Sequence, residues 1–455
     1  MIQTVDNYFK FLNREDSENY YFKCDKLKAS QKKIIGEKLE ITLSNFKADK
    51  NNTILPIFQS KDKKDDELII SITKNGDDYI GQTGNFIGKF LYRGIEIDIS
   101  SRFSDAFLNR MLNFANDVYL DDVSIFEAKD SKDFDYSKYV IYYMFIQKLE
   151  KAFLLGLPKA YNSINHHDMK LRGKIDINRF IKNDIPFRGK ISSVSREQKE
   201  IQEIIDLLHK AISIIEKNSF STKNISHIKA HLKQNKSNQF VSNQTISQAL
   251  KSKALKNPIF TPYKKVIEYA RFIINADNLE EKKGANKQTF GFLIDVSELF
   301  ELYLYKLLKK EFSDWEVIHE EQLSVYTSAF YKRNMYPDIV MKKDNDLLVF
   351  DAKYKKMNFR GSDNLGMGDL DRGDFYQIHT YMSYYQNEGN LLAGGLLYPM
   401  DEQFYKDKCI SDNWLGGDGK FIVDGIEVKE NLDIKESEKA FIERIKETYL
   451  VKTHT

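Results

Sequence analysis

Cysteine is nearly absent from this chain, which has Cys24 and Cys409 as its two cysteines among 455 residues. The two positions lie far apart in the sequence, which argues against a disulfide framework and against a cysteine-based zinc site. Few cysteines are also typical of proteins that work in a reducing compartment. We therefore expect a cytoplasmic protein.

Long hydrophobic runs are also missing. No stretch approaches the roughly 18 consecutive apolar residues that a membrane-spanning helix requires. The first residues, MIQTVDNYFKFLNRED, lack the basic segment and apolar core of a secretory signal. We expect no association with a membrane.

The chain has little excess charge of either sign, and one segment has no acidic residue. The formal net charge is +2, so any basic surface must be local. Residues 217–267 contain ten lysines but no aspartate or glutamate. Such a segment is either a solvated connector rich in Asn, Gln and Ser or a phosphate-facing surface. The scarcity of aromatic residues for base stacking favours the connector.

Composition and periodicity predict three domains. Hydrophobic residues make up 42% of the chain, which is sufficient for two or three cores. Short β-like runs over 68–100 predict a β-rich domain, and helical patterns over 136–155 and 196–217 predict a helical one. A polar break near 280–288 precedes the last domain. The expected domains are 1–130, 131–285 and 286–455.

The last domain has the pattern helix, strand, hairpin, helix, strand. Its first helix is expected over 292–310, and a later helix is expected to begin at Asp374 and to end near Gln386. This order predicts a mixed α/β fold in which helices flank one sheet.

One hairpin organises this domain, the stretch YPDIVMKKDNDLLVFDAKYK at 336–355. If its polar turn is centred after Asp344, Asp338 faces Asp351 across the two strands. Like charges in directly opposed positions destabilise a sheet, so a pair of this kind points to a functional role. Side chains alternate with period two, so Lys353 lies on the same face as Asp351. The pattern PD…DxK predicts a metal-dependent nuclease site.

Neighbouring helices offer further candidates. Glu301 lies in an apolar helix, where a carboxylate is costly unless it is paired or bound to a metal. The alternatives are that Glu301 points into water at the helix edge, or that Glu298 is the helix carboxylate. Gln377 and Tyr381 share one face of the later helix, although Gln377 would instead complete a capping box if Asp374 is the N-cap.

These residue types suit phosphodiester hydrolysis. Asp338, Asp351 and Glu301 supply the hard oxygen ligands that one or two Mg²⁺ ions prefer, with Mn²⁺ as a substitute. The metal lowers the pKa of a bound water and offsets charge that develops on the scissile phosphate. Lys353 would orient the water, deprotonate it or stabilise the pentavalent phosphate, and the sequence does not choose among these roles.

The motifs together resemble the McrC family, the nuclease subunits of McrBC-type restriction systems within the PD-(D/E)xK superfamily. GFLIDVSELFELYLYKLL, YPDIVM, LLVFDAKYK, DFYQIHTYMSYY and GGLLYP follow one another in the family's order. LRGKIDINRF at 171–180 resembles the family's middle region, and FIGKFLYRGIEIDIS resembles its N-terminal β segment more loosely. One departure is Ser101-Arg102, where a Pro-Lys pair is expected.

The resemblance implies a PD-(D/E)xK nuclease fold for 286–455 and an endodeoxyribonuclease that cuts double-stranded DNA in defence against foreign DNA. It also implies that Asp338, Asp351, Lys353, Glu301 and Gln377 form the catalytic site. The N-terminal domain would dock on a hexameric AAA+ GTPase, McrB, which activates cutting. The chain has no GxxxxGK[ST] loop, which agrees with a separate motor. Two alternatives remain, an autonomous metal-dependent nuclease and a non-catalytic adaptor that stimulates the GTPase.

Overall fold

The structure is a computed structural model that divides into two compact units. The first unit combines Met1–Ser131 with Lys287–Thr455, and the second contains Lys132–Asn286. The sequence analysis instead separated the two outer segments. No helix among the described residues is both long and apolar enough to cross a membrane. The structure describes residues 2–6, 9–11, 40, 46–47, 54–57, 68–75, 78–92, 95–115, 136–218, 220–281, 290–324, 334–355, 370–401, 409–411, 414–416, 419–429 and 432–450.

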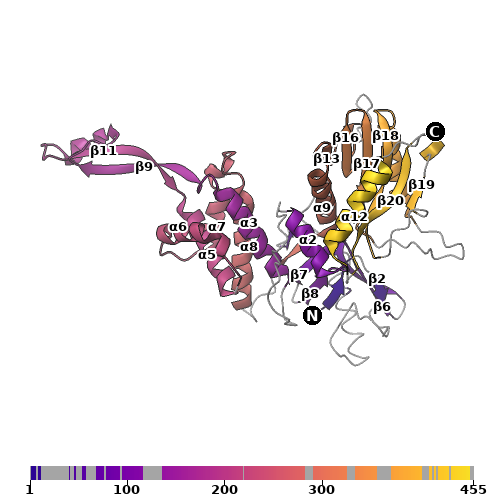
Figure 1. The fold of residues 1–455 in the computed structure, drawn as a ribbon. Coiled ribbons are helices and arrows are strands. Elements are labelled where there is room, and N and C mark those ends of the chain that lie inside the picture. The colour runs from indigo at the N-terminus through magenta and orange to yellow at the C-terminus, as the bar shows by residue number, and fades with distance from the viewer. Residues whose placement is uncertain are drawn as a thin grey trace, which may run out of the picture. The chain divides into compact units, whose positions relative to one another are not determined.

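A mixed sheet of six described strands forms the core of the C-terminal part of the first unit (Figure 1). Its strands, in sheet order, are β13 (Glu316–His319), β16 (Ile339–Lys343), β17 (Asp346–Ala352), β18 (Asn390–Met400), β20 (Lys420–Glu427) and β19 (Ile410–Ser411). β17 is antiparallel to β16 and parallel to β18, which is in turn parallel to β20. β17 and β18 are buried almost throughout, as parallel strands covered on both faces are.

β16 and β17 form the predicted hairpin. Ile339 pairs with Phe350, a register that centres the turn after Asp344. Asp344 has a φ of 52°, a left-handed conformation that aspartate tolerates better than most residues. The predicted register is confirmed, and continued by one residue it places Asp338 opposite Asp351.

Helices pack against this sheet from several sides. α10 (Arg372–Tyr385) packs on the face that carries Val340 and Val349. Because side chains alternate along β17, Asp351 points to the same face as Val349. α9 (Val296–Glu311) contacts β13 and β17, and α12 (Ile434–Arg444) contacts β20 (Figure 1).

The start of α9 differs from the prediction of a helix from residue 292. The preceding segment, β12 (Phe290–Asp295), is a strand, and the Asp295 side chain caps α9 by accepting from the backbone nitrogens of Ser297 and Glu298 at 3.1 and 3.3 Å. An aspartate N-cap satisfies backbone donors that the first helical turn leaves open. The cap therefore fixes where Glu298 and Glu301 lie on the helix.

β12 also explains why the outer segments of the chain form one unit. It pairs antiparallel with β7 and parallel with β4, so a C-terminal strand completes an N-terminal sheet. This sheet contains, in order, β1 (Ile2–Val5), β8 (Ile95–Ser100), β7 (Phe86–Tyr92), β12 and β4 (Ile54–Ile57). A second N-terminal sheet contains β2 (Phe9–Phe11), β6 (Asp78–Thr83), β5 (Leu68–Asn75) and β3 (Phe46–Lys47).

N-terminal residues also hold Tyr354, the residue that follows Lys353 just beyond the end of β17. The Tyr354 hydroxyl lies 3.2 Å from Ser101 Oγ, and the Arg102 guanidinium donates to the Tyr354 carbonyl oxygen. Arg102 in turn forms an ion pair with buried Asp6, at 3.3 Å from Nε to Oδ2. The Ser101-Arg102 pair that departs from the family pattern therefore anchors the residue directly after Lys353.

The second unit is not wholly helical as predicted, because it carries an antiparallel hairpin sheet. β9 (Lys159–Asp168) and β11 (Ile191–Glu200) pair over ten residues, with β10 (Lys174–Ile175) at the edge. The helix expected over 196–217 begins only at Gln202. The helices are α3 (Tyr136–Phe153), α4 (Ile177–Asn183), α5 (Gln202–Lys217), α6 (Ser226–Asn235), α7 (Asn243–Leu250) and α8 (Tyr263–Glu281).

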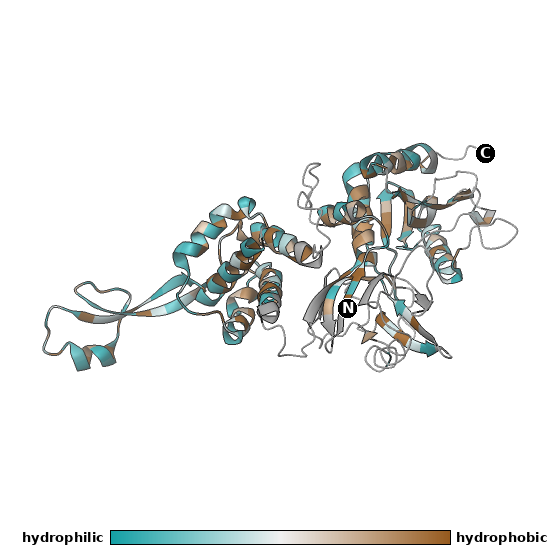
Figure 2. Cartoon of the chain, turned by 90° about the horizontal axis from the view of Figure 1, so that it is seen from below, coloured by the Kyte–Doolittle hydropathy of each residue, from teal (hydrophilic) through white to brown (hydrophobic). Residues whose placement is uncertain are grey.

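Apolar side chains at the end of this hairpin are exposed. Figure 2 shows hydrophobic residues, in brown, in this part of the chain. We call the segment between β9 and β11, residues 169–190, the hairpin tip. α4 lies within it and has no buried residue. The exposed large hydrophobic side chains of the tip are Met169, Leu171, Ile175, Ile177, Ile181, Ile185 and Phe187. None of the exposed large hydrophobic residues in the described part of the chain lies within 1–130.

Candidate active site

Asp338 and Asp351 face each other at the end of the hairpin that is far from the turn. The Asp351 residue is 0% exposed, whereas Asp338 is half-buried. Asp338 Oδ2 accepts a hydrogen bond from the backbone nitrogen of Ala352 at 2.7 Å. The two strands therefore bring two carboxyl groups together in a site with little water, as the register predicts.

The environment of the two carboxyls disfavours negative charge on both. Burial raises the pKa of Asp338 well above its usual value, the nearby Asp351 raises it further, and Lys353 opposes the shift. Burial also raises the pKa of Asp351, against the opposing charge of Lys353. Apart from its ion pair with Lys353, Asp351 has no hydrogen-bond donor at either carboxyl oxygen. A buried carboxylate pair of this kind requires a proton or a cation.

Lys353 supplies one positive charge at this site. Its Nζ lies 2.5 Å from Asp351 Oδ2 and 3.9 Å from Asp374 Oδ1. Burial lowers the pKa of Lys353, but the charges of Asp351, Asp338 and Asp374 outweigh burial and raise the pKa overall. Lys353 is therefore a protonated cation at neutral pH, which makes it a poor acceptor for a proton from water.

Gln377 and Tyr381 face the same site from α10. Gln377 Oε1 accepts from Lys353 Nζ at 3.2 Å, and its Nε2 donates to the Tyr381 hydroxyl at 3.0 Å. The Tyr381 hydroxyl donates in turn to the carbonyl oxygen of Tyr336 at 3.2 Å. Gln377 thus connects the hairpin to the helix and restrains the Lys353 ammonium.

The alternative role for Gln377, in a capping box with Asp374, is wrong. The N-cap of α10 is Asp371, which accepts from the backbone nitrogens of Gly373 and Asp374 at 2.8 and 3.2 Å. Asp374 lies inside the helix and accepts from Lys355 Nζ at 2.7 Å. Sequence reasoning treated Asp374 only as a cap, although its spacing of three residues from Gln377 would have placed it on the same helical face.

Both helix glutamates lie together near the carboxyl pair, and they have a third neighbour. Glu298 is buried and Glu301 half-buried, and each has a carboxylate oxygen within 4.8 Å of one on Glu320. The Glu298 charge also raises the pKa of Asp338. Glu320 was missed by the sequence analysis. It directly follows β13, whose last residue pairs with the first residue of β16, and its backbone nitrogen donates to the Asp338 carbonyl at 3.1 Å.

The donor set fits a hard divalent cation. Asp351 is fully buried and has only Lys353 to balance its charge, while the three glutamates form a group of carboxylates of their own. Mg²⁺ and Mn²⁺ bind carboxylate oxygens of this kind. Among the described residues, the glutamate group is the only set of three or more close His, Cys, Asp or Glu side chains.

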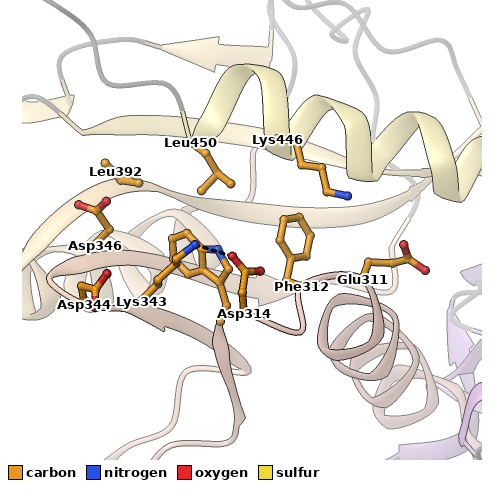
Figure 3. A pocket seen from close by; sticks show the side chains of 10 residues that line it. Glu311, Phe312, Asp314, Lys343, Asp344, Asp346, Leu392, Lys446 and Leu450 are labelled. Atoms are coloured by element: carbon orange, nitrogen blue, oxygen red, sulfur yellow. Dashed lines mark hydrogen bonds and ion pairs between the residues drawn. The ribbon is translucent and has the colours of Figure 1, made fainter.

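A separate cavity lies at the opposite end of the hairpin (Figure 3). It has a volume of about 390 Å³ and is lined by Asp346 and Lys446 among others. Asp346 is five residues before Asp351, or about 17 Å along an extended strand. Lys343 at its rim pairs with Asp314, and Lys446 lies 5.4 Å from the Phe312 ring centre. This cavity is therefore not part of the carboxylate site.

Comparisons with known proteins agree with this architecture. A protein-family model described as "McrBC 5-methylcytosine restriction system component" matches residues 80–399. The fold is similar to that of a chain from an assembly of Thermococcus gammatolerans McrB AAA+ hexamers with bound McrC. The two share 13% sequence identity with a TM-score of 0.53, and the match covers 98% of this chain and 99% of that chain.

Two further solved structures show weaker likeness. A chain of the Thermococcus gammatolerans McrBC complex gives a TM-score of 0.32 at 13% identity, with 68% of this chain and 87% of that chain covered. Protein VC1899 from Vibrio cholerae gives a TM-score of 0.21 at 12% identity, with 54% of this chain and 56% of that chain covered. Both scores are too low to support an argument. No curated protein matches the sequence.

Proposed function

The chain belongs to the McrBC 5-methylcytosine restriction system component family, and from this membership we propose that it is the McrC-type endonuclease subunit of such a system. It would hydrolyse phosphodiester bonds of double-stranded foreign DNA when a GTP-hydrolysing AAA+ motor activates it. The observation that carries the proposal is the fully buried Asp351 carboxylate, with half-buried Asp338 and Lys353 beside it and Gln377 hydrogen-bonded to the lysine. This is the PD…DxK pattern of a PD-(D/E)xK nuclease, assembled on one sheet face.

Asp338 and Asp351 would hold the metal, with Glu298, Glu301 and Glu320 as further ligands. Bound there, Mg²⁺ lowers the pKa of a water molecule and offsets charge on the scissile phosphate. The position of the Lys353 ammonium, paired with Asp351 and hydrogen-bonded to Gln377, supports one of the three roles left open by the sequence, stabilisation of the pentavalent phosphate by a fixed positive charge. Gln377 orients the ammonium for that role, because its Oε1 accepts one of the three ammonium hydrogens.

Metal binding should stabilise the first unit more at pH 8 than at pH 6. A carboxyl whose pKa is higher in the folded than in the unfolded state stabilises the fold while it is protonated. This stabilisation is complete below the unfolded pKa of about 4 and is lost as the pH rises through the folded pKa. Protons compete with the metal for Asp338 and Asp351, so the gain in stability from Mg²⁺ should be larger at the higher pH. A free Mg²⁺ concentration of 100 times Kd would raise the free energy of unfolding by about 2.7 kcal/mol.

The measurement is thermal unfolding with and without MgCl₂ at both pH values. Both tryptophans of the chain, Trp315 and Trp414, lie in the first unit, so their fluorescence follows its unfolding. An Asp351→Asn variant should lose the effect of Mg²⁺. A shift of equal size at both pH values, or one retained in the variant, would contradict a metal at these carboxyls.

The exposed apolar side chains of the hairpin tip are consistent with a surface that docks on an AAA+ partner. Contiguous exposed apolar surface marks interaction sites, and the tip exposes Met169, Ile177 and Phe187 by 80%, 67% and 64%. The sequence analysis placed partner docking in 1–130, where the described residues expose no large hydrophobic side chain. We therefore assign motor docking to the hairpin tip. The fold similarity to a chain from McrB hexamers with bound McrC agrees with a partner of this class.

The deciding experiment reconstitutes the chain with an McrB-type AAA+ GTPase, GTP, Mg²⁺ and double-stranded DNA. We expect cleavage only when all components are present, and loss of cleavage in Asp338→Ala and Lys353→Ala. Cutting by the chain with Mg²⁺ alone would indicate an autonomous nuclease. Stimulated GTP hydrolysis without any cutting would indicate an adaptor.

A second pair of variants separates docking from cutting. Ile177→Ser with Ile181→Ser at the hairpin tip should weaken binding of the motor by at least about tenfold, because serine cannot replace the apolar surface that isoleucine buries in a complex. Leu154→Ser with Leu155→Ser removes similarly exposed apolar residues outside the tip, at 81% and 68% exposure, and should bind the motor normally. Equal losses of affinity in the two variants would overturn the assignment of the tip.

A further inference from the structure

The acid-free segment 217–267 belongs to the second unit and contains no residue of the proposed cutting site, which belongs to the first unit. The chain has 67 acidic residues in 455, so 51 residues of average composition would hold between seven and eight. This segment holds none, while it keeps ten lysines. Its composition is therefore a local bias rather than a reflection of the nearly neutral chain.

Acidic residues from outside the segment neutralise few of these lysines. Lys217, Lys229 and Lys265 pair with Asp277, Glu216 and Glu268 at 3.2, 2.5 and 3.2 Å. The remaining seven are exposed and have no acidic partner within the described residues. They are Lys223, Lys233, Lys236, Lys251, Lys253, Lys256 and Lys264.

Four of the exposed lysines lie within 14 residues of one another in the sequence, in the turns between α7 and α8 and the start of α8. Lys251 follows α7, Lys253 and Lys256 lie in the 3₁₀ helix Lys253–Lys256, and Lys264 lies in the first turn of α8. Side chains three residues apart in a 3₁₀ helix point the same way, about 6 Å apart along the axis. Leu255 and Tyr263 are fully buried, which fixes these turns to the unit. We call Lys251, Lys253, Lys256 and Lys264 the lysine surface.

The rest of the segment has the polar chemistry that binds phosphates. α6 carries two lysines together with exposed Ser, Asn and Gln side chains, and α7 exposes Asn243, Gln244 and Gln248. Beside the start of α6 lies a cavity of about 550 Å³ whose lining includes Ser221, Lys223 and Ser226, together with the Glu216–Lys229 ion pair. Lysines with hydroxyl and amide side chains make most protein contacts to the DNA backbone.

We propose that the lysine surface binds the phosphate backbone of duplex DNA independently of sequence and holds it while the cutting site works. The inference rests on the proposed function only for the choice of DNA as the polyanion. The proposal does not include stacking on DNA bases, because Phe240 is the one exposed aromatic residue among the described residues of the segment. An acidic protein partner fits less well, since protein interfaces are depleted in lysine and enriched in aromatic residues and arginine.

The test measures binding of a fluorescent 30-base-pair duplex by the full chain over a range of salt concentrations. All proteins carry Asp351→Asn, so that the DNA stays intact. The test variant changes the four lysines of the lysine surface to glutamine. The matched control makes the same change at four exposed lysines of the same unit that lie outside both the lysine surface and the hairpin tip, Lys151, Lys159, Lys199 and Lys265.

We expect the test variant to bind at least tenfold more weakly at low salt than the control. Removing one lysine–phosphate ion pair should reduce the slope of log K against log salt by about 0.9, so the slope should fall by about 2 to 4. Equal binding by the two variants would overturn the proposal, and so would normal DNA binding combined with loss of motor binding. A chain that binds DNA this way but never cuts it with motor and Mg²⁺ would overturn the proposed nuclease and leave this inference standing.

Discussion

Replacing Asp351 by asparagine should slow DNA cleavage by the reconstituted complex roughly a thousandfold, which equals about 4 kcal/mol of transition-state stabilisation. Asp351 is 0% exposed, and its one neighbouring cation among the described residues is Lys353, at 2.5 Å. Asparagine keeps the size of the side chain but removes its charge. The site would then lose one of the carboxylates proposed to hold the metal, and the group that holds the Lys353 ammonium in place.

A change at the other end of the same strand is the control. Asp346→Asn also converts aspartate to asparagine on β17, but Asp346 lies beside the hairpin turn, where its Oδ1 accepts from Asn390 Nδ2 at 2.6 Å. Asparagine can still accept that hydrogen bond, so this variant should cut within about twofold of wild type. GTP hydrolysis by the motor should be unchanged in both variants. Wild-type cleavage by Asp351→Asn would show that the chemistry takes place elsewhere.

Replacing Arg444 by methionine should destabilise the first unit by about 3–5 kcal/mol, because it leaves a buried carboxylate without its cation. Arg444 Nε and Nη2 donate to Asp424 at 3.0 and 2.9 Å, and the Tyr449 hydroxyl also donates to Asp424. Asp424 is 0% exposed, and burial raises its pKa against the influence of Arg444 and Tyr449. This cluster fastens the C-terminal helix to β20 in the six-stranded sheet.

Urea unfolding followed by tryptophan fluorescence measures this loss of stability in the first unit. Lys439→Met removes an exposed ion pair on the same helix, 3.9 Å from Glu443, and should cost roughly 0–0.5 kcal/mol. The double variant Arg444→Met, Asp424→Leu should regain much of the stability, because no unpaired charge remains. If Arg444→Met unfolds at the same urea concentration as wild type, the cluster does not hold the helix.

The sequence by itself determined the hairpin and the residues that face each other across it. A polar turn between two apolar strands fixes the register, and the period of two then fixes which side chains share a face. This is local information, so Asp338, Asp351 and Lys353 could be placed from spacing alone. The same holds for Gln377 and Tyr381, whose separation of four residues puts them on one helical face.

Tertiary structure decided what depends on partners distant in the chain. The pattern of 292–310 is compatible with a helix throughout, yet Phe290–Asp295 becomes a strand because β7 and β4 offer pairing partners some 200 residues earlier. That pairing joins the outer segments into one unit, and the Asp295 cap then fixes the direction of Glu298 and Glu301. Glu320 reaches the site because β13 pairs with β16, and Asp374 reaches it because α10 packs on the sheet. The spacing of residues along the sequence does not reveal either of these contacts. The hairpin alone thus predicted a pair of carboxylates, whereas long-range pairing decided which other oxygen ligands surround them.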